Sequence, residues 1–89
     1  MIDNETTIVN KLGLHARAAS KLVSCASSFS SEVWLQKDDR EVNGKSIMGV
    51  LTLAASKGTQ LTIRVEGRDE EQAMEELLAL IESRFGEDE

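Results

Sequence analysis

The stretch Leu61-Thr62-Ile63-Arg64-Val65-Glu66 alternates apolar and polar side chains with a period of two. Successive side chains of a β-strand point to opposite faces, so this stretch is predicted to be a strand with one buried face and one polar face. A half-buried strand of this kind needs a hydrophobic layer on its apolar side. The flanking segments are therefore expected to supply that layer.

The segment after this strand has helical spacing. Its apolar residues recur three and four positions apart and form one inward stripe: Ala73, Met74, Leu77, Leu78, Ile81 and Phe85. Asp69 lies at the expected start, and Gln72 three residues later completes a capping-box pattern. Gly86 is typical of a helix end. A helix over residues 70–85 is predicted, with its stripe against the sheet.

The rest of the chain divides into five further elements. They are predicted as a strand at Thr6–Val9, a helix at 16–29, strands at Glu32–Lys37 and Arg40–Asn43 joined by a turn, and a short helix at 47–55. Each element has one strongly apolar face, which favours a sheet covered by helices on one side. The pattern alone therefore predicts an α+β fold with the order β-α-β-β-α-β-α.

Length and charge limit the function classes. The chain has 89 residues, enough for one small domain with a single core. It has 10 Lys and Arg against 16 Asp and Glu, and this excess of acid argues against nucleic acid as a main partner. Much of the acid lies towards the C-terminus, including Glu87, Asp88 and Glu89. These side chains are expected to form a solvated helix face and a frayed tail.

Three features indicate the compartment. The start, Met1–Glu5, is acidic and lacks the apolar core of a signal peptide. No apolar run approaches the roughly 20 residues that span a bilayer, so no membrane insertion is expected. Cys25 is the only cysteine, which excludes an intramolecular disulfide and is compatible with a reducing environment. We expect a cytoplasmic protein, with Cys25 as a packing residue.

His15 is the only histidine and falls where the first helix is expected to begin, after a turn at Gly13. A helix N-terminus offers free backbone N–H groups and the positive end of the helix dipole, and both attract anions. This field disfavours an imidazolium, so the ring is expected to be neutral with one nucleophilic nitrogen. Arg17 can offer a forked cation to a phosphate. The pattern suggests a histidine that accepts a phosphoryl group.

Other roles for His15 remain open at this point. A lone histidine is commonly a surface or structural residue. The chain has no second histidine, Cys-x-x-Cys motif or close carboxylate cluster that would complete a metal site, so no metal is expected. No Ser or Cys has an obvious His–Asp relay, because any such relay would need this same histidine as its base.

Two motifs resemble the signatures of one known family, HPr, the histidine-containing phosphocarriers of the bacterial phosphotransferase system. The active-site signature is matched by Asn10-Lys11-Leu12-Gly13-Leu14-His15-Ala16-Arg17, and the serine-site signature by Asn43-Gly44-Lys45-Ser46-Ile47-Met48-Gly49-Val50-Leu51. The resemblance covers essentially the whole chain. One departure is Ala18, where the family commonly has proline. Alanine is the best helix former, so the first turn should persist with less rigidity.

The resemblance implies a single HPr-like domain over residues 1–89. Its fold would be an open-faced sandwich, a four-stranded antiparallel sheet with three helices on one face. His15 would accept a phosphoryl group on Nδ1 from phosphorylated enzyme I, itself charged by phosphoenolpyruvate, and pass it to enzyme IIA proteins. Backbone N–H groups of Ala16 and Arg17 would cradle the phosphate, and the Arg17 side chain would screen its charge. Such a protein is a monomeric, stoichiometric carrier without a cofactor, and not an enzyme with turnover.

The second motif implies regulation and docking. Ser46 resembles the serine that an HPr kinase/phosphorylase modifies, although serine before a helix is also a common N-cap. The helix after it is apolar almost all round, and so short a helix cannot bury every side. An exposed apolar patch at Ile47, Met48 and Leu51 is expected, and in the family it docks partners together with Arg17.

Two alternatives remain to a phosphocarrier that serves sugar transport. One is a regulatory phosphocarrier of the nitrogen-related branch. The other, from a different class, is a binding module that regulates partners through the Ile47/Met48 surface without phosphorylation.

Overall fold

The computed structural model describes every residue from Met1 to Glu89 and contains one antiparallel sheet in the order β1-β4-β2-β3. Its strands are β1 (Ile2–Thr7), β2 (Glu32–Lys37), β3 (Arg40–Asn43) and β4 (Gln60–Glu66). The alternating stretch forms β4, between β1 and β2, and its three apolar side chains are all buried: Leu61, Ile63 and Val65. The sequence prediction for this strand is confirmed.

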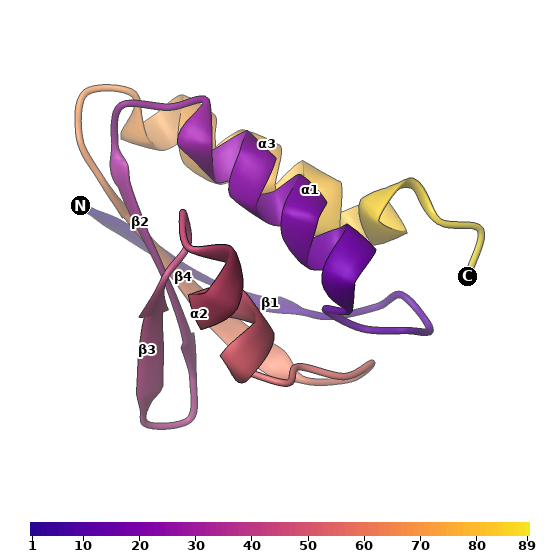
Figure 1. Ribbon diagram of the computed structural model, residues 1–89. Helices are drawn as coiled ribbons and strands as arrows, with labels where there is room; N and C mark the ends of the chain where they lie inside the picture. The colour runs from indigo at the N-terminus through magenta and orange to yellow at the C-terminus, as the bar shows by residue number, and fades with distance from the viewer.

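Three helices cover one face of the sheet (Figure 1): α1 (Ala16–Ser27), α2 (Ile47–Thr52) and α3 (Glu70–Glu82). Helices α1 and α3 lie side by side and run in opposite directions, and α2 contacts α1 and β3. The core fills the space between these layers, with Leu22, Leu35, Leu77 and Ile81 among its fully buried side chains. The open-faced sandwich and the predicted element order are confirmed. None of the helices has the length and apolar character that crossing a bilayer requires.

The first strand begins earlier than predicted. It spans residues 2–7 and not 6–9, because β1 is an edge strand that pairs with β4 through its backbone while most of its side chains stay exposed. Ile8 follows the strand and is fully buried. Its N–H donates to the carbonyl of Thr59 at 2.9 Å, and its own carbonyl accepts from Gly58 at 2.7 Å. Ile8 is apolar because its side chain packs in the core, and it does not belong to the strand.

The last helix also differs from its prediction. It ends at Glu82, and a 3₁₀ turn, η1 (Arg84–Gly86), follows it. Asp69 lies at the N-cap but makes no capping hydrogen bond, so the capping-box prediction is wrong. The Asp69 carboxylate instead accepts hydrogen bonds from the backbone N–H groups of Ser30 and Ser31 at 2.9 and 3.0 Å. It ties the start of α3 to the segment that joins α1 to β2.

The other two helices are shorter than predicted. Helix α1 ends at Ser27, because the N–H groups of Ser28 and Phe29 bond back three residues, to the carbonyls of Cys25 and Ala26. Helix α2 ends at Thr52, and the chain leaves it through Ala54 with φ of 50°. Tight turns of this kind satisfy the last carbonyls of a helix.

Candidate functional site

His15 occupies the N-cap of α1, as predicted, with φ and ψ of −75° and 179°. The first helix-type hydrogen bond joins the N–H of Ala19 to the His15 carbonyl at 2.8 Å. The N–H groups of Ala16 and Arg17 precede it and have no partner within the helix. Both residues are exposed. The structure thus brings a ring and two free N–H donors together at one helix start.

The turn before His15 is held in place from two sides. Gly13 has φ of +67°, and a Cβ there would lie 2.5 Å from the Ala55 carbonyl oxygen. That carbonyl accepts a hydrogen bond from the N–H of Leu14 at 2.8 Å. The side-chain amide of Asn10, which is fully buried, donates to the Gly13 carbonyl at 2.9 Å. Only glycine allows the turn to approach so closely, and the turn fixes where α1 begins.

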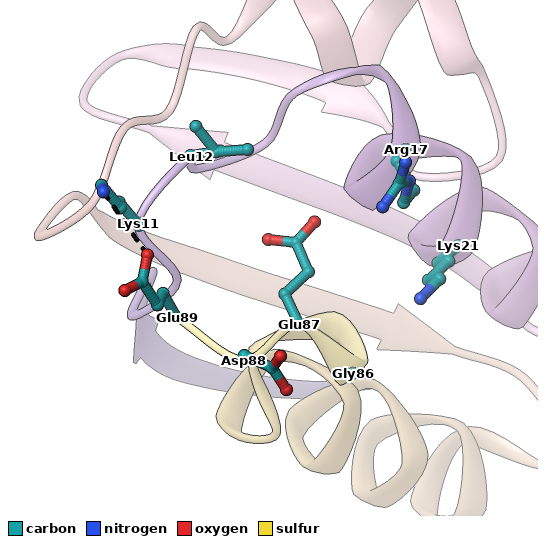
Figure 2. Close-up of a pocket in the computed structure, with 8 residues that line it drawn as sticks. All are labelled: Lys11, Leu12, Arg17, Lys21, Gly86, Glu87, Asp88 and Glu89. Carbon is teal, nitrogen blue, oxygen red and sulfur yellow. Dashed lines mark hydrogen bonds and ion pairs between the residues drawn. The ribbon is translucent and has the colours of Figure 1, made fainter.

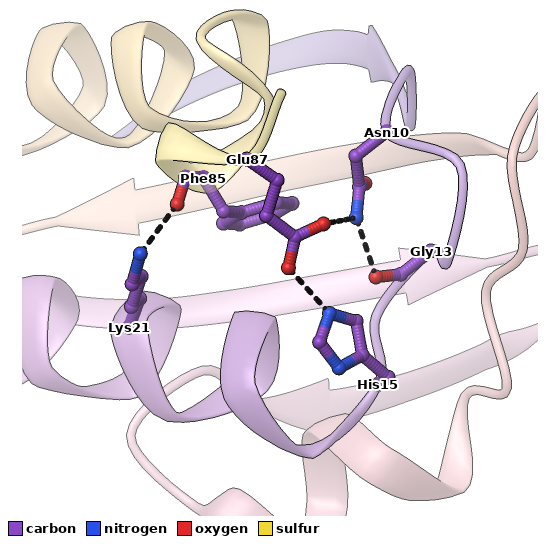
Figure 3. A network of polar contacts seen from close by, with 6 residues as sticks. All are labelled: Asn10, Gly13, His15, Lys21, Phe85 and Glu87. Atoms are coloured by element: carbon purple, nitrogen blue, oxygen red, sulfur yellow. Dashed lines mark hydrogen bonds and ion pairs between the residues drawn. The ribbon is translucent and has the colours of Figure 1, made fainter. Parts of the chain in front are cut away.

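Glu87 contacts the histidine ring directly (Figure 3). Its Oε2 lies 2.6 Å from Nε2 of His15, and its Oε1 accepts from Nδ2 of Asn10 at 2.9 Å. The side chains of His15 and Glu87 are 28% and 14% exposed. The hydrogen bonds from Asn10 and then from His15 lower the pKa of the Glu87 carboxyl below its ordinary value. The expectation that Glu87 belongs to a frayed tail is therefore wrong.

A sharp turn carries the tail to the site. Arg84 and Phe85 both have positive φ, 60° and 55°, and Phe85 is buried in the core. The ammonium of Lys21 donates to the Phe85 carbonyl at 2.7 Å, which joins the turn to α1. The backbone N–H of Lys11 donates to the main-chain oxygen of Glu89 at 2.7 Å. The sequence signalled only that Phe85 is apolar and in phase with α3, so the tail's position could not be predicted.

A shallow cleft of about 630 Å³ lies between the tail and the start of α1 (Figure 2). It is lined by Lys11, Leu12, Arg17, Lys21, Gly86, Glu87, Asp88 and Glu89. Arg17 is exposed and forms no ion pair with these carboxylates, so its guanidinium is free to meet an incoming anion. Leu12 is 66% exposed, a surface apolar residue that the sequence analysis did not single out.

The second motif forms the start of α2. The Oγ of Ser46 accepts a hydrogen bond from the N–H of Gly49 at 3.1 Å, so Ser46 is an N-cap. Ile47 and Met48 are 38% and 69% exposed, which confirms the expected apolar surface, whereas Leu51 is half-buried. Helix α2 contacts α1, so the starts of the two helices that carry the motifs belong to packed neighbours.

A family model described as "PTS HPr component phosphorylation site" matches residues 2–83. The chain belongs to the HPr family. It is 53% identical to the phosphocarrier protein HPr of Cupriavidus necator over 89 residues, with 100% of each chain covered. The resemblance inferred from the two motifs is thereby confirmed.

Solved structures of family members agree with the fold. HPr-C-His from Thermoanaerobacter tengcongensis superimposes with a TM-score of 0.97 at 48% identity, covering 100% of both chains. A structure described as an HPr dimer from the same organism gives a TM-score of 0.79 at 49% identity, covering 98% of this chain and 100% of the other. The relatives include both phosphocarrier proteins HPr and HPr-like proteins named Crh, such as that of Bacillus subtilis, which is 43% identical over 82 residues and covers 92% of this chain and 96% of the relative. Glu87 lies beyond the segment that the family model matches.

Proposed function

We propose that this protein is a phosphocarrier in which His15 accepts a phosphoryl group from phosphorylated enzyme I and passes it to an enzyme IIA protein. The observation that carries the proposal is the placement of the only histidine, in a member of the HPr family, at an exposed helix start. Phosphoenolpyruvate is the primary source of the phosphoryl group, which sets the reaction in the cytoplasm.

The site suits transfer in both directions. Charge on a transferring phosphoryl group spreads over its oxygens, and catalysis is largely positioning and charge stabilisation. The free N–H groups of Ala16 and Arg17 can each donate to a phosphate oxygen, and the Arg17 guanidinium adds a mobile positive charge. Because Arg17 is exposed, it does not enclose the phosphate. An open site lets the second partner reach the phosphorus atom.

Docking is assigned to the surface around α2. Ile47 and Met48, with the half-buried Leu51 at their edge, offer an apolar patch, and Arg17 adds charge recognition for enzyme I and the enzyme IIA proteins. Phosphorylation of Ser46 by an HPr kinase/phosphorylase would place a dianion at the edge of this patch, where it would oppose docking of an acidic partner. We propose a monomer as the working form, which light scattering of the purified protein measures directly.

Intact mass spectrometry tests the proposal. The protein is incubated with enzyme I and phosphoenolpyruvate and should gain one phosphate that acid removes. His15→Ala should gain none, while its circular dichroism remains native, because loss of an N-cap costs on the order of 1 kcal/mol, well short of the stability of a typical domain. Acid-labile phosphate on the variant would exclude His15 as the acceptor. Absence of phosphate on the wild type would contradict the carrier function itself.

A further inference from the structure

The contact between His15 and Glu87 settles which ring nitrogen carries hydrogen. The lowered pKa keeps Glu87 ionised at neutral pH, and a carboxylate can only accept hydrogen bonds. Nε2 of His15, 2.6 Å from Oε2, must therefore be the donor. In a neutral ring the other nitrogen, Nδ1, then holds the lone pair. Nδ1 points away from Glu87 and makes no capping hydrogen bond to α1 (Figure 3).

We propose that Glu87 is a positioning residue for phosphoryl transfer. Its carboxylate keeps the hydrogen on Nε2, which leaves Nδ1 as the nucleophile, and it balances the charge that the ring acquires when Nδ1 takes the phosphoryl group. This inference rests on the proposed function and adds to it a residue from outside the segment that the family model matches.

The transfer step balances without a proton leaving the ring. The lone pair of Nδ1 forms the bond to phosphorus, and the electron pair of the breaking bond stays on the donor, phosphorylated enzyme I. Nε2 keeps its hydrogen throughout. The ring becomes a phosphoimidazolium, whose positive charge faces the Glu87 carboxylate across a charge-assisted hydrogen bond. On transfer to enzyme IIA the bond to Nδ1 breaks, its electron pair returns to Nδ1, and the charge disappears.

Two opposing fields act on the ring, and their sizes decide the outcome. The N-terminus of a helix is equivalent to about half a positive charge and disfavours a cationic ring. The carboxylate has a full negative charge in direct hydrogen-bond contact with Nε2. It is the larger charge and is in direct contact with the ring, so it is the stronger influence on the ring that carries phosphate.

Asn10 fixes the position of the Glu87 carboxylate relative to the His15 ring. Its Nδ2 donates to both the Gly13 carbonyl and Oε1 of Glu87, so the turn that places His15 also places Glu87. Because Asn10 is fully buried, it cannot replace a lost acceptor with water. This arrangement predicts what a glutamine would do at position 87. Its single carbonyl oxygen would remain with Asn10, and its NH₂ group would face Nε2.

The experiment combines phosphorylation kinetics with ¹⁵N NMR of the His15 ring at pH 8. Partners that orient a metal-binding histidine through its second nitrogen typically change activity about 10–100-fold, and we expect an effect of this size at His15. Glu87→Ala removes the carboxylate and should slow phosphorylation by enzyme I about tenfold. Glu87→Gln should slow it about 100-fold, because the amide NH₂ forces the hydrogen onto Nδ1. The ring spectrum of the glutamine variant should show a protonated Nδ1, whereas the wild type shows a protonated Nε2.

Asp88→Asn is the matched control. It removes one negative charge from the same cleft, but Asp88 is exposed and its side chain makes no hydrogen bond to His15 or Asn10. The Asp88→Asn variant should be phosphorylated by enzyme I at the wild-type rate. Wild-type rates in both Glu87 variants, or a ring in Glu87→Gln that keeps its hydrogen on Nε2, would overturn the inference. If the wild type accepts no phosphate, the proposed function fails, while the NMR comparison still tests how Glu87 places the hydrogen.

Discussion

Replacing Gly13 by alanine tests how strictly the turn between β1 and α1 sets the position of His15. At φ of +67° an alanine is strained by about 1 kcal/mol. Its Cβ would also lie 2.5 Å from the Ala55 oxygen and 2.8 Å from the Ser56 Cα. Both are backbone atoms, so the segments must separate, which typically costs about 1–3 kcal/mol. We expect a total destabilisation of about 2–4 kcal/mol.

The consequence should appear in two measurements. In a domain of this size each kcal/mol lowers Tm by about 4–8 °C, so Gly13→Ala should melt about 8–32 °C lower. Separation of the segments also strains the hydrogen bond from the N–H of Leu14 to the Ala55 carbonyl. Leu14 directly precedes His15, so the histidine should be displaced as well. A displacement of about 1 Å at a reacting group can reduce a rate about 100-fold, and we expect slower phosphorylation below the melting transition.

Gly58→Ala is the control, because Gly58 also has positive φ, +92°, but no atom lies within 4 Å of the position of its Cβ. It should show only the backbone strain, about 1 kcal/mol, and normal phosphorylation. The difference between the two variants isolates the steric contact. Equal melting temperatures for Gly13→Ala and Gly58→Ala would refute the argument that close approach makes glycine necessary at position 13.

Three further predictions follow from single side chains. Arg17→Ala should slow phosphoryl transfer in both directions with little change in Tm, and Arg17→Lys should recover only part of the rate because it lacks the planar fork; unchanged kinetics would mean that the backbone N–H groups suffice. Ser46→Asp should keep the N-cap and melt at or above the wild-type temperature yet be phosphorylated on His15 more slowly, and a variant that melts lower but reacts normally would leave Ser46 only a structural role. Hydrogen bonds from the Ser31 hydroxyl and from backbone N–H groups lower the pKa of Asp69 to about 2. Because this lies below the unfolded value of about 3.9, Asp69 stabilises the fold above pH 4, and this stabilisation is lost as the pH falls towards 2. Asp69→Asn should therefore melt lower at pH 7 and lose less stability between pH 4 and 2, and parallel melting curves for the two proteins would contradict this.

Local patterns were sufficient where a structural feature depends on neighbours in the chain. The alternation from Leu61 to Val65 predicted the buried face of β4, and the spacing from Ala73 to Ile81 predicted that of α3. The cap at Ser46 was equally local, since its partner is the N–H of Gly49, three residues away. Predictions failed where the partner is distant. The Asp69 carboxylate has the residue type of an N-cap, but it bonds to Ser31, 38 residues away in sequence.

For this protein, the sequence by itself determined the secondary-structure order, the family and the position of His15 at a helix start, because periodicity and short motifs encode burial and chain direction locally. Only the tertiary structure decided that Glu87 meets His15, across 72 residues. No periodic pattern encodes that contact, which depends on how the turn at Arg84 and Phe85 packs against α1. A polar side chain bonds to whichever group the fold brings within about 3 Å, and that distance is set by the packing of the whole core.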